Sequence, residues 1–208
     1  YALMIIGTLA LTGFPFLSGF YSKDAIIEFA YLSNTTTGYY AAGIGIFTAF
    51  LTSIYSWRLI FKTFHGQYNN NEIKIEETHE SPLVMLIPLI LLSIGAIFAG
   101  FAFKELFIGF DGVNNFWNNS ILFLEPLSTE HPPFWFLLLT PILVIFSIPL
   151  AYYLFIQNKN LPTQIANVNR PLYNFLLNKW YFDEFYDILI VNPSKKTGLF
   201  LWKFFDIK

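Results

Sequence analysis

The stretch ALTGFPFLSGFYSKD, residues 10–24, decides the fold because it interrupts an apolar segment that is too long for one membrane crossing. Residues 2–32 as one straight helix would measure about 46 Å, whereas a hydrocarbon layer about 30 Å thick needs roughly 20 helical residues. Pro15 removes an amide donor, and Gly13 and Gly19 on either side add backbone freedom. We therefore predict two half-helices joined by an unwound stretch. Such a break is tolerated at membrane depth only where protein or a wet cavity surrounds it.

Outward from this stretch, three further charge-poor runs are long enough to cross a membrane. A spanning backbone must satisfy its own hydrogen bonds in lipid, so each run is predicted to be helical. The predicted fold is all-α, a polytopic transmembrane helical bundle with one broken helix. The spans are predicted at about 2–32 (broken), 40–62, 82–103 and 133–157, within a transmembrane region 1–158.

The remaining segment, 159–208, contains no run that could span a membrane. Its aromatic residues around Trp180 alternate with Asp183, Glu184 and Asp187. Aromatic rings with one wet edge suit a membrane interface. We therefore predict an interfacial C-terminal tail. Because the chain starts with Tyr1 and enters an apolar run at once, we also expect it to be a piece of a longer protein.

The basic residues predict an orientation for the bundle. Most of the lysines and arginines, including Arg58, Lys62 and Lys74, fall on one predicted side, whereas only Lys104 falls on the other. By the positive-inside tendency the basic side faces the cytoplasm or a matrix. Arg58 and Lys62, one turn apart, are interpreted as anchors at that interface.

Composition excludes several classes of function. Of the 208 residues 55% are hydrophobic and only 12% are charged, about half the charge of a soluble domain. The absence of cysteine excludes thiolate-held iron–sulfur clusters and disulfides, and no cofactor is expected in this chain. His65, His79 and His131 lack ligand spacing, so no metal site is predicted. A net charge of −2 without a basic cluster argues against nucleic acid as a partner, and membrane lipid is the expected surroundings.

Lys23 is the residue most suggestive of chemistry. If the second half-helix runs to about Leu32, Lys23 lies roughly 14 Å from the outer surface, near mid-depth. A cation there costs about 2.5–3.5 kcal/mol on insertion scales and commonly marks an ion path. With Asp24 beside it and Glu28 one turn later, it forms a candidate proton path. Asp24 and Glu28 lie close to one face and Lys23 on another, so no Lys–Glu pair within this helix is expected. Alternatively, the first span is unbroken to Tyr21 and Lys23 only reaches out to the interface.

Residues 10–24 closely resemble the proton-translocating antiporter-like subunit of respiratory complex I, called subunit L in bacteria and chain 5 of NADH–ubiquinone oxidoreductase in mitochondria. The later stretch NKWYFDEFYD, residues 178–187, is similar to the same family. Two motifs in the same order make the resemblance specific. It covers essentially the whole chain as a C-terminal fragment of the family's length.

The resemblance implies a function and a set of partners. It implies proton translocation across an energy-transducing membrane, with NADH oxidation and quinone reduction in other subunits, so the chain would be an enzyme subunit without redox chemistry of its own. The membrane would be the bacterial inner or the mitochondrial inner membrane. The partners would be other complex I subunits, especially a neighbouring antiporter-like subunit, and the tail would lead into a lateral helix. Lys23 would be the proton-path lysine on the broken helix and Asp24 its neighbouring carboxylate. The family's earlier spans are absent from this sequence, so this fragment alone is not expected to pump.

Two alternatives remain open at this point. A large subunit of a multisubunit cation/proton antiporter shares the broken helices and the lysine without redox coupling. A structural membrane scaffold would use Lys23 only as an anchor.

Overall fold

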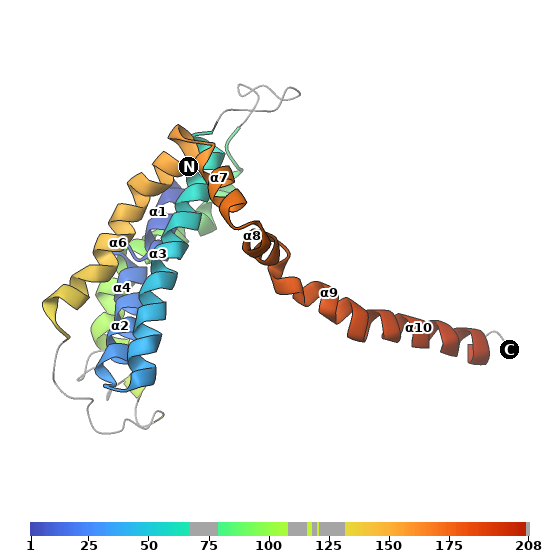
Figure 1. The fold of residues 1–208 in the computed structure, drawn as a ribbon. Helices are drawn as coiled ribbons and strands as arrows, with labels where there is room; N and C mark the ends of the chain where they lie inside the picture. The colour runs from blue at the N-terminus through green and yellow to red at the C-terminus, as the bar shows by residue number, and fades with distance from the viewer. Residues whose placement is uncertain (67–78, 108–115, 118–119, 121–131, 207–208) are drawn as a thin grey trace. The chain divides into compact units, whose positions relative to one another are not determined.

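The computed structural model describes residues 1–66, 79–107, 116–117, 120 and 132–206, and the regular elements in these ranges are all helices (Figure 1). Three of the helices are long and apolar enough to cross a membrane. The predicted all-α membrane bundle is therefore confirmed. Lys74 and His131, used above to judge orientation and metal binding, lie outside the described residues. The chain divides into two compact units, Tyr1–Asn158 and Lys159–Lys208.

The helices of the first unit follow the predicted spans, with ends that differ by a few residues. The helix that covers the second predicted span starts earlier than expected because the Thr35 hydroxyl accepts the amide of Gly38 at 3.0 Å and caps its first turn. The bounds are α1 Ala2–Thr12, α2 Ser18–Leu32, α3 Thr36–Phe64, α4 Leu83–Phe107, and α6 Phe134–Tyr152 continuing as the π-helix η2 Tyr153–Gln157.

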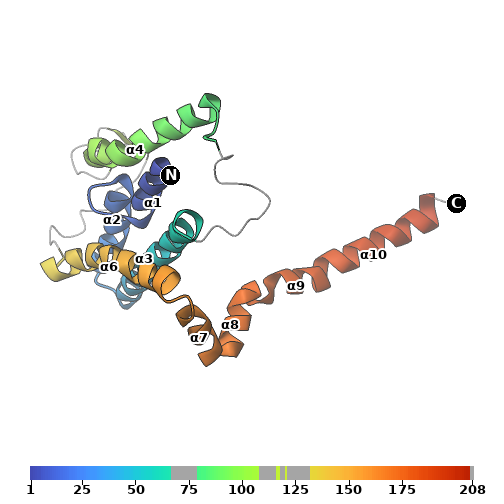
Figure 2. The same ribbon diagram turned by 90° about the horizontal axis from the view of Figure 1, so that it is seen from above.

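The two half-helices occupy the middle of the first unit. α1 and α2 each contact α3 and α4, and α3 packs along α6. Viewed from above, α1 and α2 therefore lie between α4 on one side and α3 with α6 on the other (Figure 2). One apolar cluster joins Trp57, Ile60 and Phe61 of α3 to Ala151 of α6. The two half-helices on either side of the break are thus flanked by other helices of the same unit.

The buried polar side chains of the first unit are hydroxyls in the part of the chain that the structure describes. Between α3 and α6 the hydroxyls of Ser53 and Ser147 are in direct contact, and Ser147 also donates to the carbonyl of Val144 at 2.6 Å. Interhelical hydroxyl bonds of this kind hold helices together in an apolar solvent that gives no hydrophobic drive for association. The full set is Thr8, Thr12, Ser53, Ser56, Ser93, Thr140 and Ser147.

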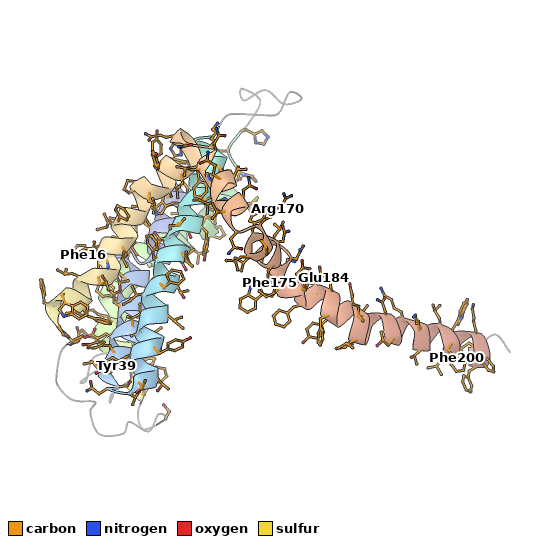
Figure 3. All side chains as sticks on the ribbon, viewed as in Figure 1. Phe16, Tyr39, Arg170, Phe175, Glu184 and Phe200 are labelled. Carbon is orange, nitrogen blue, oxygen red and sulfur yellow. The ribbon has the colours of Figure 1, made fainter. Side chains whose placement is uncertain are left out.

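The second unit is a chain of short helices without buried residues over 159–206. Its aromatic side chains, such as Phe175 and Phe200, project from the helices (Figure 3). The backbone turns through left-handed conformations at Lys179, Trp180 and Tyr181, which have φ values of 52°, 63° and 58°. The bounds are α7 Leu161–Val168, α8 Arg170–Leu177, η3 Lys179–Tyr181, α9 Phe182–Tyr186, η4 Asp187–Val191, α10 Asn192–Leu201 and η5 Trp202–Asp206.

Candidate functional site: a lysine at a helix break

α1 ends in a defined hydrogen-bonded cap. Gly13 has φ 80° and ψ 36°, the left-handed conformation, and its amide bonds to the carbonyl of Ala10 at 3.2 Å. The amide of Phe14 reaches back to the carbonyl of Leu9 at 3.0 Å. These two bonds form a Schellman motif, which requires a residue that tolerates positive φ after the last helical residue. Gly13 therefore ends α1 by its conformation.

The chain between the two helices is short and locally irregular. Pro15 lies in it, and Phe16 has a φ of 71° and is 79% exposed (Figure 3). Leu17 is extended, and α2 begins at Ser18. Gly19, which the sequence places at the edge of the break, is already the second residue of α2. The unwound stretch is therefore narrower than residues 13–19, because the backbone returns to helical geometry at Ser18.

Lys23 reaches back across the break to the end of α1. Its Nζ donates to the carbonyl of Leu11 at 2.6 Å. The last carbonyls of a helix have no partner within the helix, and those of Leu9 and Ala10 are taken by amides of the break. Leu11 is the next carbonyl in that series, and the ammonium supplies its partner. The negative end of the α1 dipole also favours a cation at this position.

The direction of the Lys23 side chain follows from the face of α2 that meets α1. Gly19 lies one turn before Lys23 on that face, and a Cβ at position 19 would lie 1.8 Å from the carbonyl oxygen of Ala10. A Cβ on Gly13 would lie 3.3 Å from Cδ of Lys23. The two glycines therefore let the lysine stem pass close to the backbone of the break.

The two carboxylates of the candidate proton path are only partly buried and lie elsewhere on α2. Over the described ranges, neither Asp24 nor Glu28 comes within 4 Å of the Lys23 ammonium to form an ion pair. The structure thus brings Lys23 together with Leu11 and Gly13, and both carboxylates lie beyond ion-pair distance from its ammonium. The roles of Asp24 and Glu28 stay predictions.

Two partners in this site are absent from the sequence analysis. One is the Leu11 carbonyl. Its position in the last turn before a left-handed glycine could have predicted that it lacks a partner within the helix. The other is Ser18, whose hydroxyl bonds to the backbone of α4. The sequence feature that could have predicted this contact is a pair of small residues, Ser18 and Gly100, because small residues let helices approach closely in membranes.

Comparison with known proteins identifies similar chains. No family model matches the chain. NADH-ubiquinone oxidoreductase chain 5 of Phytophthora infestans is 42% identical over 205 residues, which cover 95% of this chain and 30% of the relative. The Arabidopsis thaliana chain 5 is 37% identical in an alignment that covers 95% of this chain and 30% of the relative. NADH-quinone oxidoreductase subunit L of Rhodobacter capsulatus is 34% identical in an alignment that covers 98% of this chain and 38% of the relative.

The chain therefore spans about a third of the length of the curated relatives it matches. Those relatives carry the two names that the motifs at residues 10–24 and 178–187 predict. Over nearly all of its length, the chain is related to one part of the NADH-ubiquinone oxidoreductase chain 5 and NADH-quinone oxidoreductase subunit L family.

Proposed function

We propose that this chain is part of a proton-translocating membrane subunit of an NADH:quinone oxidoreductase, in which Lys23 relays protons. The names of the relatives support the assignment to this enzyme, and the three apolar helices support a place in the membrane. Electron transfer and its cofactors would belong to other subunits. The partners would be those subunits, foremost a neighbouring antiporter-like subunit, and the lipid of a bacterial or mitochondrial inner membrane.

The observation that carries the proposal is the 2.6 Å contact between the Lys23 ammonium and the Leu11 carbonyl. A protonated lysine makes a charge-assisted bond to this helix end, and a neutral amine makes a weaker one. Loss of one proton from the ammonium to a water molecule therefore frees a flexible side chain, and uptake of a proton draws it back. The helix break thus couples the charge of Lys23 to its position.

Two features favour this function over the alternatives. The relatives named above are NADH oxidoreductases, which favours that enzyme over a cation/proton antiporter. A scaffold would use Lys23 as an anchor whose ammonium reaches out to water. Here the ammonium caps a helix of its own unit, which favours a relay.

The test is the substitution Lys23→Ala in the full-length protein within the assembled oxidoreductase. The substitution removes the amine that carries the proton, so proton translocation should fall about tenfold or more. Lys179→Ala is the matched control, because Lys179 belongs to an exposed ion pair with Asp183 in the second unit. Proton translocation is measured in vesicles together with NADH oxidation and the amount of assembled complex. Unchanged proton-to-electron stoichiometry and turnover in Lys23→Ala would refute the relay.

A further inference from the structure

The first turn of α2 is also held by α4. The Ser18 hydroxyl lies 2.9 Å from the carbonyl of Gly95 and 2.8 Å from that of Ala96, and it accepts the amide of Gly100 at 3.2 Å. Ala96 and Gly100 are four residues apart in α4, so their carbonyl and amide belong to one rung of its own hydrogen-bond ladder. One side chain of α2 is therefore bound to the backbone of α4 itself.

Gly100 makes this close approach possible. A Cβ at position 100 would lie 2.5 Å from Cα of Ser18 and 2.7 Å from Cδ2 of Tyr21. One turn further along each helix, the ammonium of Lys104 lies 5.6 Å from the centroid of the Tyr21 ring. The face of α2 that carries Ser18 and Tyr21 thus packs against the face of α4 that carries Gly100 and Lys104.

The two contacts of this turn point in different directions. Ser18 binds α4, whereas its neighbour Gly19 packs on the Ala10 carbonyl of α1. Lys23 extends from the same face as Gly19, one turn later, to reach Leu11. The distance between the ammonium and its carbonyl therefore depends on how this one turn is placed between α1 and α4.

We propose that Ser18 is a positioning residue for Lys23, acting by fixing the first turn of α2 to the backbone of α4. This inference rests on the proposed relay function of Lys23. In this proposal Ser18 carries no proton itself. Its hydroxyl sets where the lysine stem starts, and a shift of α4 along this contact changes how well the ammonium meets the end of α1.

The experiment is a double-mutant cycle in the full-length protein within the assembled oxidoreductase. Ser18→Ala, Lys23→Ala and the double variant are compared for proton translocation, NADH oxidation and amount of complex. Ser22→Ala is the matched control, because among the described residues the Ser22 hydroxyl bonds within α2 alone, to the Gly19 carbonyl at 3.3 Å. Ser18→Ala should lower proton translocation about tenfold, as expected for the weakening of the Lys23 contact, with normal assembly. In the Lys23→Ala background it should have no further effect, since a residue that acts through another loses its influence when that residue is gone.

The outcomes separate the two proposals. If Lys23→Ala lowers translocation and Ser18→Ala does not, the positioning role is wrong and the relay stands. If the two effects multiply in the double variant, Ser18 acts independently of Lys23 and the positioning role is again wrong. If Lys23→Ala has no effect, the relay fails and the inference fails with it.

If the Ser18→Ala variant does not assemble, Ser18→Cys is used in its place, because cysteine is similar in size and keeps a weaker hydrogen-bond donor. An intermediate rate in that variant supports the positioning role, and a rate equal to that of the unchanged protein contradicts it.

Discussion

The segment that contains α1 and α2 and the segment that forms α3 are similar in length and both apolar, yet only the first is broken. α3 contains Gly38, Gly43 and Gly45 and runs without interruption. α6 contains Pro141 and Pro149 and is also one helix. Glycine alone and proline alone therefore do not end a helix in this bundle. The broken segment combines a left-handed glycine, whose amide and that of the next residue bond back into α1, with a proline directly beyond them.

The difference has a chemical consequence. Within α3 the backbone carbonyls are paired along the helix, and the buried Ser53 hydroxyl contacts Ser147 on α6. At the break, a carbonyl at the end of α1 is left over, and a charged side chain can bind it. A continuous helix offers no such partner to an ammonium. A lysine is therefore accommodated where the backbone pairing stops.

The largest effect is expected where the broken segment is packed most tightly. Gly19→Ala places a Cβ 1.8 Å from the Ala10 carbonyl oxygen, so α1 and α2 must move apart. Overpacking of this kind costs about 1–3 kcal/mol or more, and here it acts on backbone that cannot rotate away. In α3, Gly43→Ala meets nothing within 4 Å and serves as the control. The amount and the thermal stability of the assembled complex should be lower for Gly19→Ala than for the unchanged protein. For Gly43→Ala both should equal those of the unchanged protein. Equal values for the two would contradict the close approach.

A moderate effect is expected from the conformation that ends α1. Gly13→Ala forces a Cβ into a backbone with φ 80°, at a cost of about 1–2 kcal/mol, and brings it 3.3 Å from Cδ of Lys23. Gly13→Asn should be milder than alanine on the backbone, because asparagine tolerates the left-handed region better. The melting temperature of the complex should be highest for the unchanged protein, lower for Gly13→Asn and lowest for Gly13→Ala. Alanine as stable as glycine would mean that the break does not depend on this conformation.

The smallest effect is expected in the continuous pair α3 and α6. Ser53→Ala removes the hydroxyl contact with Ser147, and interhelical hydrogen bonds in membranes average about 0.6 kcal/mol. Thr52→Ala is the control, because its hydroxyl bonds within α3 to the Thr48 carbonyl at 2.7 Å. A small drop in melting temperature for Ser53→Ala relative to Thr52→Ala is the expected result. A loss as large as that of Gly19→Ala would show that the hydroxyl contact contributes more than the close packing at the break.

The helices are well predicted from the sequence because their positions depend on nearby residues, chiefly on the length of each apolar run. Apolar run length predicts the spans at 40–62 and 82–103. In the structure the first runs over Thr36–Phe64, with a Thr35 cap before it, and the second begins at Leu83 and continues to Phe107. The break is also a local property, readable from Gly13 and Pro15. The contact of Ser18 with α4 is not, since its partners lie about 80 residues away and depend on which faces of the helices meet. The left-handed turn at 179–181 could not be predicted from the sequence either, because none of its residues is a glycine.

α4 differs from its neighbours in how little of it is covered by the described residues. Only 6% of its most apolar window is buried within them, against 39% for α3. Most of its surface is therefore free of contacts with the described residues, whereas the face that carries Gly100 packs against α2. A displacement of α4 would reach the first turn of α2 through the Ser18 hydroxyl and through the packing of Gly100 against Ser18 and Tyr21.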